Sequence, residues 1–100
     1  MKLLDLQPQF LYRTNDWEFK HVDTIDEAHG IRFLCPVCFQ SHAGEVGTHM
    51  VQVWWDVVPE ERRWRMKGTG YENLTLSPSL HFQEGCCWHG YVMNGEVTRC

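Results

Sequence analysis

Two short stretches of the sequence contain residues that could bind one metal ion together. Cys35-Pro36-Val37-Cys38 has two cysteines three positions apart, and Cys86-Cys87-Trp88-His89 has a cysteine three positions before a histidine. Three thiolates and one imidazole suit a tetrahedral zinc site in which protein donors fill every coordination position. We therefore predict one structural Zn²⁺ that joins the two stretches. In a chain with a modest core, such an ion can contribute on the order of 10 kcal/mol to folding.

Neighbouring cysteines and histidines leave alternatives for the ligand set. Cys86 and Cys87 are adjacent, so in an extended segment their side chains point in opposite directions and only one readily faces the ion. His42 and His49 follow the first stretch, and each could replace a ligand or support one from behind. A solvated loop histidine is the simpler interpretation of His42.

The composition narrows the class of protein. The chain has 100 residues, 43% of them hydrophobic, and a formal net charge of −4. This acidic balance argues against a general nucleic-acid-binding protein, which is normally basic. Five cysteines cannot all pair in intrachain disulfides, which favours a reduced, metal-binding role. No apolar run approaches the roughly 18–20 residues that cross a bilayer, and residues 1–6 do not resemble a signal peptide, so we expect a cytoplasmic protein.

Alternating apolar and polar residues predict short strands that are separated by turn residues. The predicted strands cover residues 3–12 (as an edge strand or arm), 17–22, 31–34, 50–58, 62–67, 74–76, 80–82, 88–93 and 96–100. Trp17 and Phe19 are expected to face inward, and strand 62–67 is expected to pair antiparallel with strand 50–58. Asn94-Gly95 predicts a tight hairpin turn, because both residues tolerate a positive φ.

A short helix is predicted at residues 24–30. Thr24 and Glu27 form a capping-box pattern, and Gly30 suits the end of a helix. We therefore expect a single zinc-binding domain over residues 1–100. It should be mostly β (a small α+β fold), with an antiparallel sheet, one short helix and zinc-ribbon-like knuckles joined by the ion.

One predicted strand is strongly basic. Residues 62–67 carry four positive charges around an indole, and the side chains of interest are Arg63, Trp64, Arg65 and Lys67. Such a strand could contact a phosphate backbone while the indole stacks on a base, or it could contact a protein partner. We favour the simpler interpretation, an exposed strand whose charges keep a sheet edge soluble, because Glu60 and Glu61 lie beside it.

Five stretches have a characteristic order and spacing. They are residues 27–39 with CPVC, 47–49 (GTH), 68–70 (GTG), 74–79 (LTLSPS) and 85–96 (GCCWHGYVMNGE). In this order they resemble a family of small phage and bacterial zinc-knuckle proteins, some of which are named ammonia monooxygenase. The cysteine of that family's second knuckle stands three residues before the histidine, so the resemblance selects Cys86 over Cys87. The ligand set that the resemblance implies is Cys35, Cys38, Cys86 and His89. It also implies a phage protein that acts in the bacterial cytoplasm, and it implies no established activity.

Three classes of function fit these patterns. The first is a zinc-stabilised interaction module that acts on a bacterial host or defence protein, and we favour it because the sequence shows no catalytic constellation. The second is a zinc-ribbon-like nucleic-acid-binding protein. The third is a zinc-dependent hydrolase or transferase, which needs an open coordination position and a pocket histidine such as His49 or His81. A cysteine nucleophile activated by histidine would leave the metal pattern unexplained. We therefore predict no catalytic residue.

Overall fold

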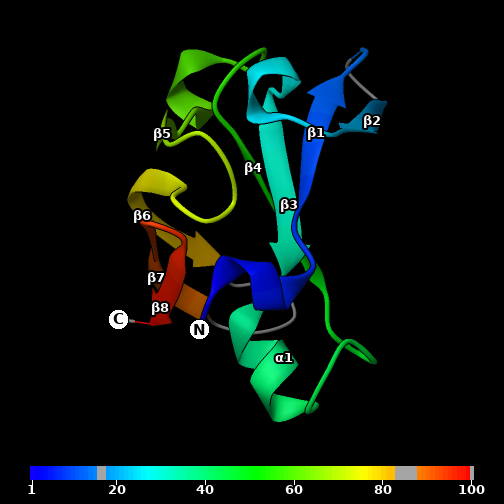
Figure 1. The fold of residues 1–100 in the computed structure, drawn as a ribbon, viewed down its shortest axis with the longest axis vertical. Helices are drawn as coiled ribbons and strands as arrows, with labels where there is room; N and C mark the ends of the chain where they lie inside the picture. The colour runs from blue at the N-terminus through cyan, green and yellow to red at the C-terminus, as the bar shows by residue number, and fades with distance from the viewer. Residues whose placement is uncertain (16–17, 83–87, 100) are drawn as a thin grey trace.

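The computed structural model describes residues 1–15, 18–82 and 88–99. Its strands form two four-stranded antiparallel sheets (Figure 1). The N-terminal sheet has the order β2-β1-β3-β4 and the C-terminal sheet the order β5-β6-β7-β8. The strands of the first sheet are β1 (Gln9–Arg13), β2 (Phe19–Val22), β3 (Gly30–Leu34) and β4 (Met50–Trp54). Those of the second are β5 (Arg65–Lys67), β6 (Thr75–Phe82), β7 (Trp88–Met93) and β8 (Glu96–Arg99). The predicted class, mostly β with antiparallel strands and one short helix, is confirmed.

The α-helix, α1 (Pro36–Ser41), follows directly on Cys35 instead of lying at residues 24–30. Cys35 is its N-cap and Pro36 its first residue, where the missing N–H costs nothing and the fixed φ of proline suits a helix. The predicted helical segment forms only the 3₁₀ turn η2 (Ile25–Glu27). The Thr24 hydroxyl does contact Glu27 Oε1, at 3.1 Å. Two further 3₁₀ turns are η1 (Leu3–Leu6) and η3 (Glu60–Arg62).

Two predictions about strand placement are wrong. Strand β5 pairs with β6, with Met66 opposite Leu76, and not with β4. Just before β5, the Trp64 N–H donates to the Trp54 carbonyl of β4 at 3.0 Å. The chain then enters the second sheet, where Met66 packs against the core. In β2, Phe19 is exposed because this edge strand lies at the rim of its sheet, whereas Trp17 is outside the described residues.

The two sheets share a buried apolar cluster. Phe33 of β3 meets Trp88 of β7 edge to face, with ring centroids 6.0 Å apart, and both side chains are fully buried. Burying a side chain as large as Phe33 contributes roughly 1.5–3 kcal/mol. Phe10 stacks on Tyr71 at 4.2 Å, and the Phe10 N–H donates to the Tyr71 hydroxyl at 3.0 Å. Burial raises the pKa of Tyr71.

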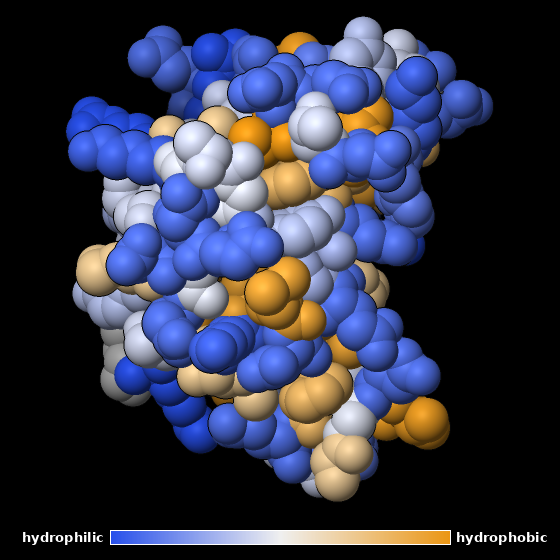
Figure 2. Space-filling model, in the orientation of Figure 1, coloured by the Kyte–Doolittle hydropathy of each residue, from blue (hydrophilic) through white to orange (hydrophobic). Residues whose placement is uncertain are grey.

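The surface that covers this core is mixed. Figure 2 shows hydrophobic side chains in several separate patches among hydrophilic ones on one face of the molecule. The β7–β8 hairpin turns at Asn94 and Gly95, whose φ values are 52° and 79°, as the Asn-Gly pair predicted. The helices within the described ranges are all too short or too polar to span a bilayer.

Candidate functional site

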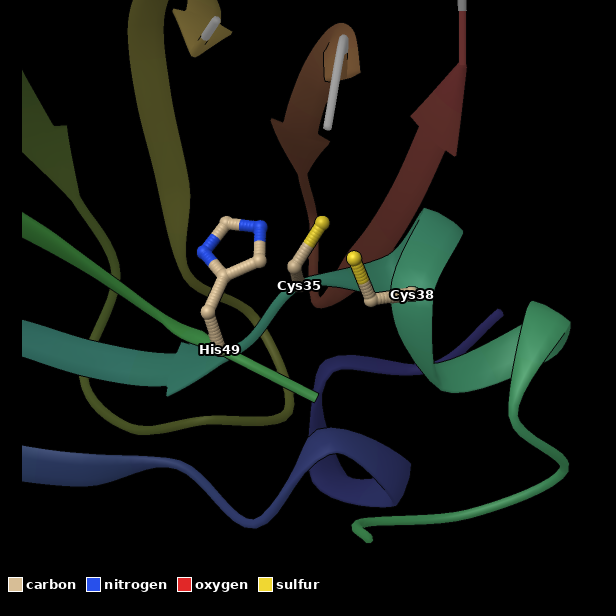
Figure 3. A group of neighbouring side chains, drawn as sticks. All are labelled: Cys35, Cys38 and His49. Carbon is tan, nitrogen blue, oxygen red and sulfur yellow. The ribbon is translucent and has the colours of Figure 1, made fainter. Parts of the chain in front are cut away.

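Three potential metal ligands meet where β3 passes into α1. The Sγ atoms of Cys35 and Cys38 and a ring nitrogen of His49 all lie within 4.8 Å of one another (Figure 3). The Cys35 N–H donates to the His49 carbonyl at 2.9 Å, which extends the β3–β4 ladder beyond its last pair, Leu34 and Met50. Strand pairing therefore sets His49 opposite Cys35, although they are far apart in sequence.

The first turn of α1 brings the second thiol to the same place. The Phe39 N–H donates to the Cys35 carbonyl and the His42 N–H to the Cys38 carbonyl, both at 2.9 Å, so the CPVC stretch is wound into a helical turn. Cys35 is fully buried and Cys38 is 8% exposed, and neither forms a disulfide. Two buried thiols and an imidazole form a soft donor set that can hold a metal ion, and Zn²⁺ fits such donors well.

Some of the predicted ligands belong to this group, and the others lie elsewhere in the fold or outside the described residues. Cys35 and Cys38 belong to it, and His49, foreseen as a supporting group or an alternative ligand, joins them. Cys86 and Cys87 lie outside the described residues, so their roles stay predictions. His42 is exposed at the end of α1, and its ring lies near Gly47.

His89 makes its contacts elsewhere, on strands β6 and β7. Its Nε2 atom lies 3.2 Å from Ser79 Oγ, within hydrogen-bonding distance. His81 is paired with His89 across the two strands, and their rings stack with centroids 4.9 Å apart at an interplanar angle of 30°. A serine hydroxyl against an imidazole nitrogen is the arrangement that activates a serine as a nucleophile.

The register between β6 and β7 is irregular on the N-terminal side of Leu80. Leu80 is opposite Gly90, but Leu76 is opposite Val92, so the three residues 77–79 of β6 face Tyr91 alone. The extra residues form a bulge, a feature that re-aims side chains and is common next to active sites. Ser79 lies two residues before His81, the cross-strand partner of His89, so it contacts His89 diagonally across the two strands.

The Ser79–His89 pair lies on the outer face of the C-terminal sheet. Along β7, buried residues alternate with exposed ones: Trp88, Gly90 and Val92 are buried, whereas His89, Tyr91 and Met93 are exposed. Trp88 holds the strand from the inner face, where its Nε1–H donates to the Thr98 carbonyl at 3.3 Å. Within the described part of the chain, the hydrogen-bond partner of the His89 ring is Ser79 and not a carboxylate, so the geometry is that of a dyad.

Comparison with protein families decides the class of this chain. The model of a family described as "Bacterial ubiquitination-like system serine protease (BubE)" matches residues 11–100. The chain belongs to this family. Comparisons with curated proteins and with solved structures gave no match.

The family overturns the predicted function. Its description is a serine protease, so the prediction of a structural zinc protein that serves as an interaction module is wrong, as are its nucleic-acid-binding and zinc-hydrolase alternatives. The bacterial part of the resemblance is confirmed, whereas the match gives no support to a phage protein, a zinc ribbon or an ammonia monooxygenase.

Sequence reasoning missed Ser79 for an identifiable reason. Ser79 is not in a G-x-S-x-G motif, which would have indicated a nucleophile, and its partner His89 is ten residues away. The available signal was the alternation of Ser79 and His81 on one strand with His89 on the next, which places three reactive side chains on one face.

Proposed function

We propose that this chain is a serine protease in which Ser79 is the nucleophile and His89 the general base. The observation that carries the proposal is the 3.2 Å separation between Ser79 Oγ and His89 Nε2 on an exposed strand pair. The family description supports the same chemistry. An exposed position also suits the task, because a polypeptide substrate has to reach the hydroxyl.

The pair can carry out both halves of acyl transfer. In the first half, Ser79 Oγ attacks the carbonyl carbon of the scissile bond while His89 Nε2 takes the hydroxyl proton. His89 then gives that proton to the leaving amine, the C–N bond breaks, and the acyl group stays on Ser79. In the second half, His89 takes a proton from water, the hydroxide attacks the ester carbonyl, and the proton returns to Ser79.

His81 acts as a positioning residue for this base. Its ring stacks on that of His89 and so limits the rotation of the imidazole, whose Nε2 lies against Ser79. In a dyad without a carboxylate among the described residues, this contact takes over part of the orienting role that an aspartate has in a triad.

The metal group has a separate, structural role in this proposal. Cys35, Cys38 and His49 would bind one Zn²⁺, with Cys86, the cysteine chosen by the sequence resemblance, as the fourth ligand. The cluster and the buried thiols support this set. It replaces His89 by His49 as the imidazole donor, which leaves His89 available as the base. The ion would tie the end of β3, the first turn of α1 and the start of β4 together.

The substrates would be bacterial proteins of the ubiquitination-like system, and the reaction would take place in the cytoplasm. Cleavage of a peptide or isopeptide bond follows from the same acyl-transfer steps, since both bonds release an amine. The family description supports this assignment.

A serine-directed covalent probe tests the proposal. The full chain should react with a fluorophosphonate at one residue, and peptide mass spectrometry should identify it as Ser79. Ser79→Ala should abolish the labelling without a change in Tm, whereas Ser41→Ala, a change at an exposed serine on α1, should label normally. Labelling of another serine, or undiminished labelling of Ser79→Ala, would overturn the assignment.

A further inference from the structure

Two hollows share a lining residue at β5, the strand that pairs with the Ser79-bearing strand β6. The smaller, of about 390 Å³, is lined by Arg65, Ser77 and Pro78, and Pro78 is bonded to Ser79. The larger has a volume of about 580 Å³ and six lining residues: Trp55, Glu60, Arg63, Trp64, Arg65 and Met66. Arg65 lines both hollows, and we call the two together the trough.

The trough has a clear chemical character. Arg65 and Lys67 alternate with the partly buried Met66, so both cations are exposed on the same face of β5. The side chain of Arg63 is held in place by its Nε–H, which donates to the Val58 carbonyl at 2.7 Å. Glu60 is the acidic residue in the lining. This local excess of positive charge stands against a net charge of −4 for the whole chain, so it favours an acidic ligand.

The walls of the larger hollow are aromatic. Trp55 and Trp64 are both partly buried and pack against the core, which leaves part of each indole to contact a ligand. The Trp64 Nε1–H is buried and has no hydrogen-bond partner among the described residues.

The position of β5 in the sheet suits an extended occupant. In the sheet order β5 comes first, so one of its edges has no strand neighbour in the described part of the chain. Extended peptides commonly bind by running along such an edge, while pockets for alternate side chains give specificity. A cavity of this size accommodates a few side chains of a peptide.

We propose that this trough is the substrate subsite of the protease. It binds an extended segment of the polypeptide next to the scissile bond and selects an acidic side chain, whose carboxylate pairs with Arg65. The inference rests on the proposed function, because it assumes that Ser79 is the nucleophile. It accounts for Arg63, Trp64 and Arg65 of the basic strand as a substrate surface.

Libraries of quenched fluorescent peptides test the subsite. Each library has Asp, Asn or Lys at one fixed position near the scissile bond and a mixture elsewhere. At one position the wild-type chain should cleave the Asp library at least about tenfold faster than the Lys library, as expected for a charge-assisted hydrogen bond. Arg65→Glu should reverse this preference, mainly through KM, and Arg65→Gln should bring the Asp-to-Lys ratio close to one.

A matched control and a separate readout keep the outcomes distinct. Lys20→Glu makes the same change in net charge on the other sheet and should keep the wild-type preference. Fluorophosphonate labelling of the wild-type chain is measured in parallel. Labelling of Ser79 without an acidic preference at any position, or with a preference that Arg65→Gln leaves unchanged, overturns the subsite alone. If Ser79 of the wild-type chain is not labelled, the proposed function and the subsite are overturned together.

Discussion

The metal-ligand group and the Ser79–His89 pair are built in opposite ways. Cys35 and Cys38 come from one helical turn and are buried, with His49 added by the adjoining strand. Ser79 and His89 lie on an exposed sheet face and meet through the pairing of two strands. Buried soft donors suit a fastener of the fold, whereas an exposed hydroxyl and imidazole suit chemistry on a large substrate. In our proposal the first region serves stability and the second serves reactivity.

The two regions nevertheless touch through the core. Phe33 lies two residues before Cys35, and Trp88 lies directly before His89. Their rings meet edge to face at 6.0 Å, so the end of β3 that carries the metal group also supports the strand that carries the base. Loss of the metal should therefore weaken the active site indirectly, through the fold.

Removal of a metal ligand should have the largest effect. Cys35→Ser should lose the bound zinc and a stabilisation on the order of 10 kcal/mol, which is comparable to the total stability of a domain. Metal analysis and thermal unfolding would show a protein that is zinc-free and largely unfolded. Cys87→Ser, at a cysteine that we predict not to bind the ion, is the control. Stoichiometric zinc and an unchanged Tm in Cys35→Ser would contradict the metal assignment.

Substitution of the base should separate the two regions. His89→Ala should reduce kcat by about 10²–10⁴-fold, the range for loss of a general base, while zinc content and Tm stay at wild-type values. Peptide cleavage and metal analysis on the same preparation make the comparison. If His89→Ala instead loses zinc together with its stability, His89 is a metal ligand, as the sequence alone predicted, and the division between the regions collapses.

Removal of the stacking partner should have the smallest effect. His81→Ala leaves Ser79 and His89 in place but removes the ring contact, so kcat should fall by up to about tenfold. KM should stay within about twofold, because His81 orients the base and does not bind substrate in this scheme. His81→Phe, which retains a stacking ring, should restore much of the rate. A loss as large as that of His89→Ala would mean that His81 itself transfers protons.

Local patterns predicted most of the strands but not their partners. Alternation along residues 88–93 and the Asn94-Gly95 turn predicted the β7–β8 hairpin, because both signals act between near neighbours. The strand that contains Arg65 was expected beside β4, since the two segments follow one another in sequence. It joins β6 instead, where Met66 packs into the shared core, and sequence proximity carries no information about that choice.

The sequence by itself determined the chemical repertoire of this protein. The CPVC stretch specified two thiols close enough to bind one ion, although the helical turn that carries them was not predicted. Only the tertiary structure decided the partners: pairing of β3 with β4 set His49 beside the thiols, and pairing of β6 with β7, with His81 opposite His89, set Ser79 against His89. The physical reason is that strand register depends on packing across the whole sheet, and a shift of one residue moves every side chain to the other face.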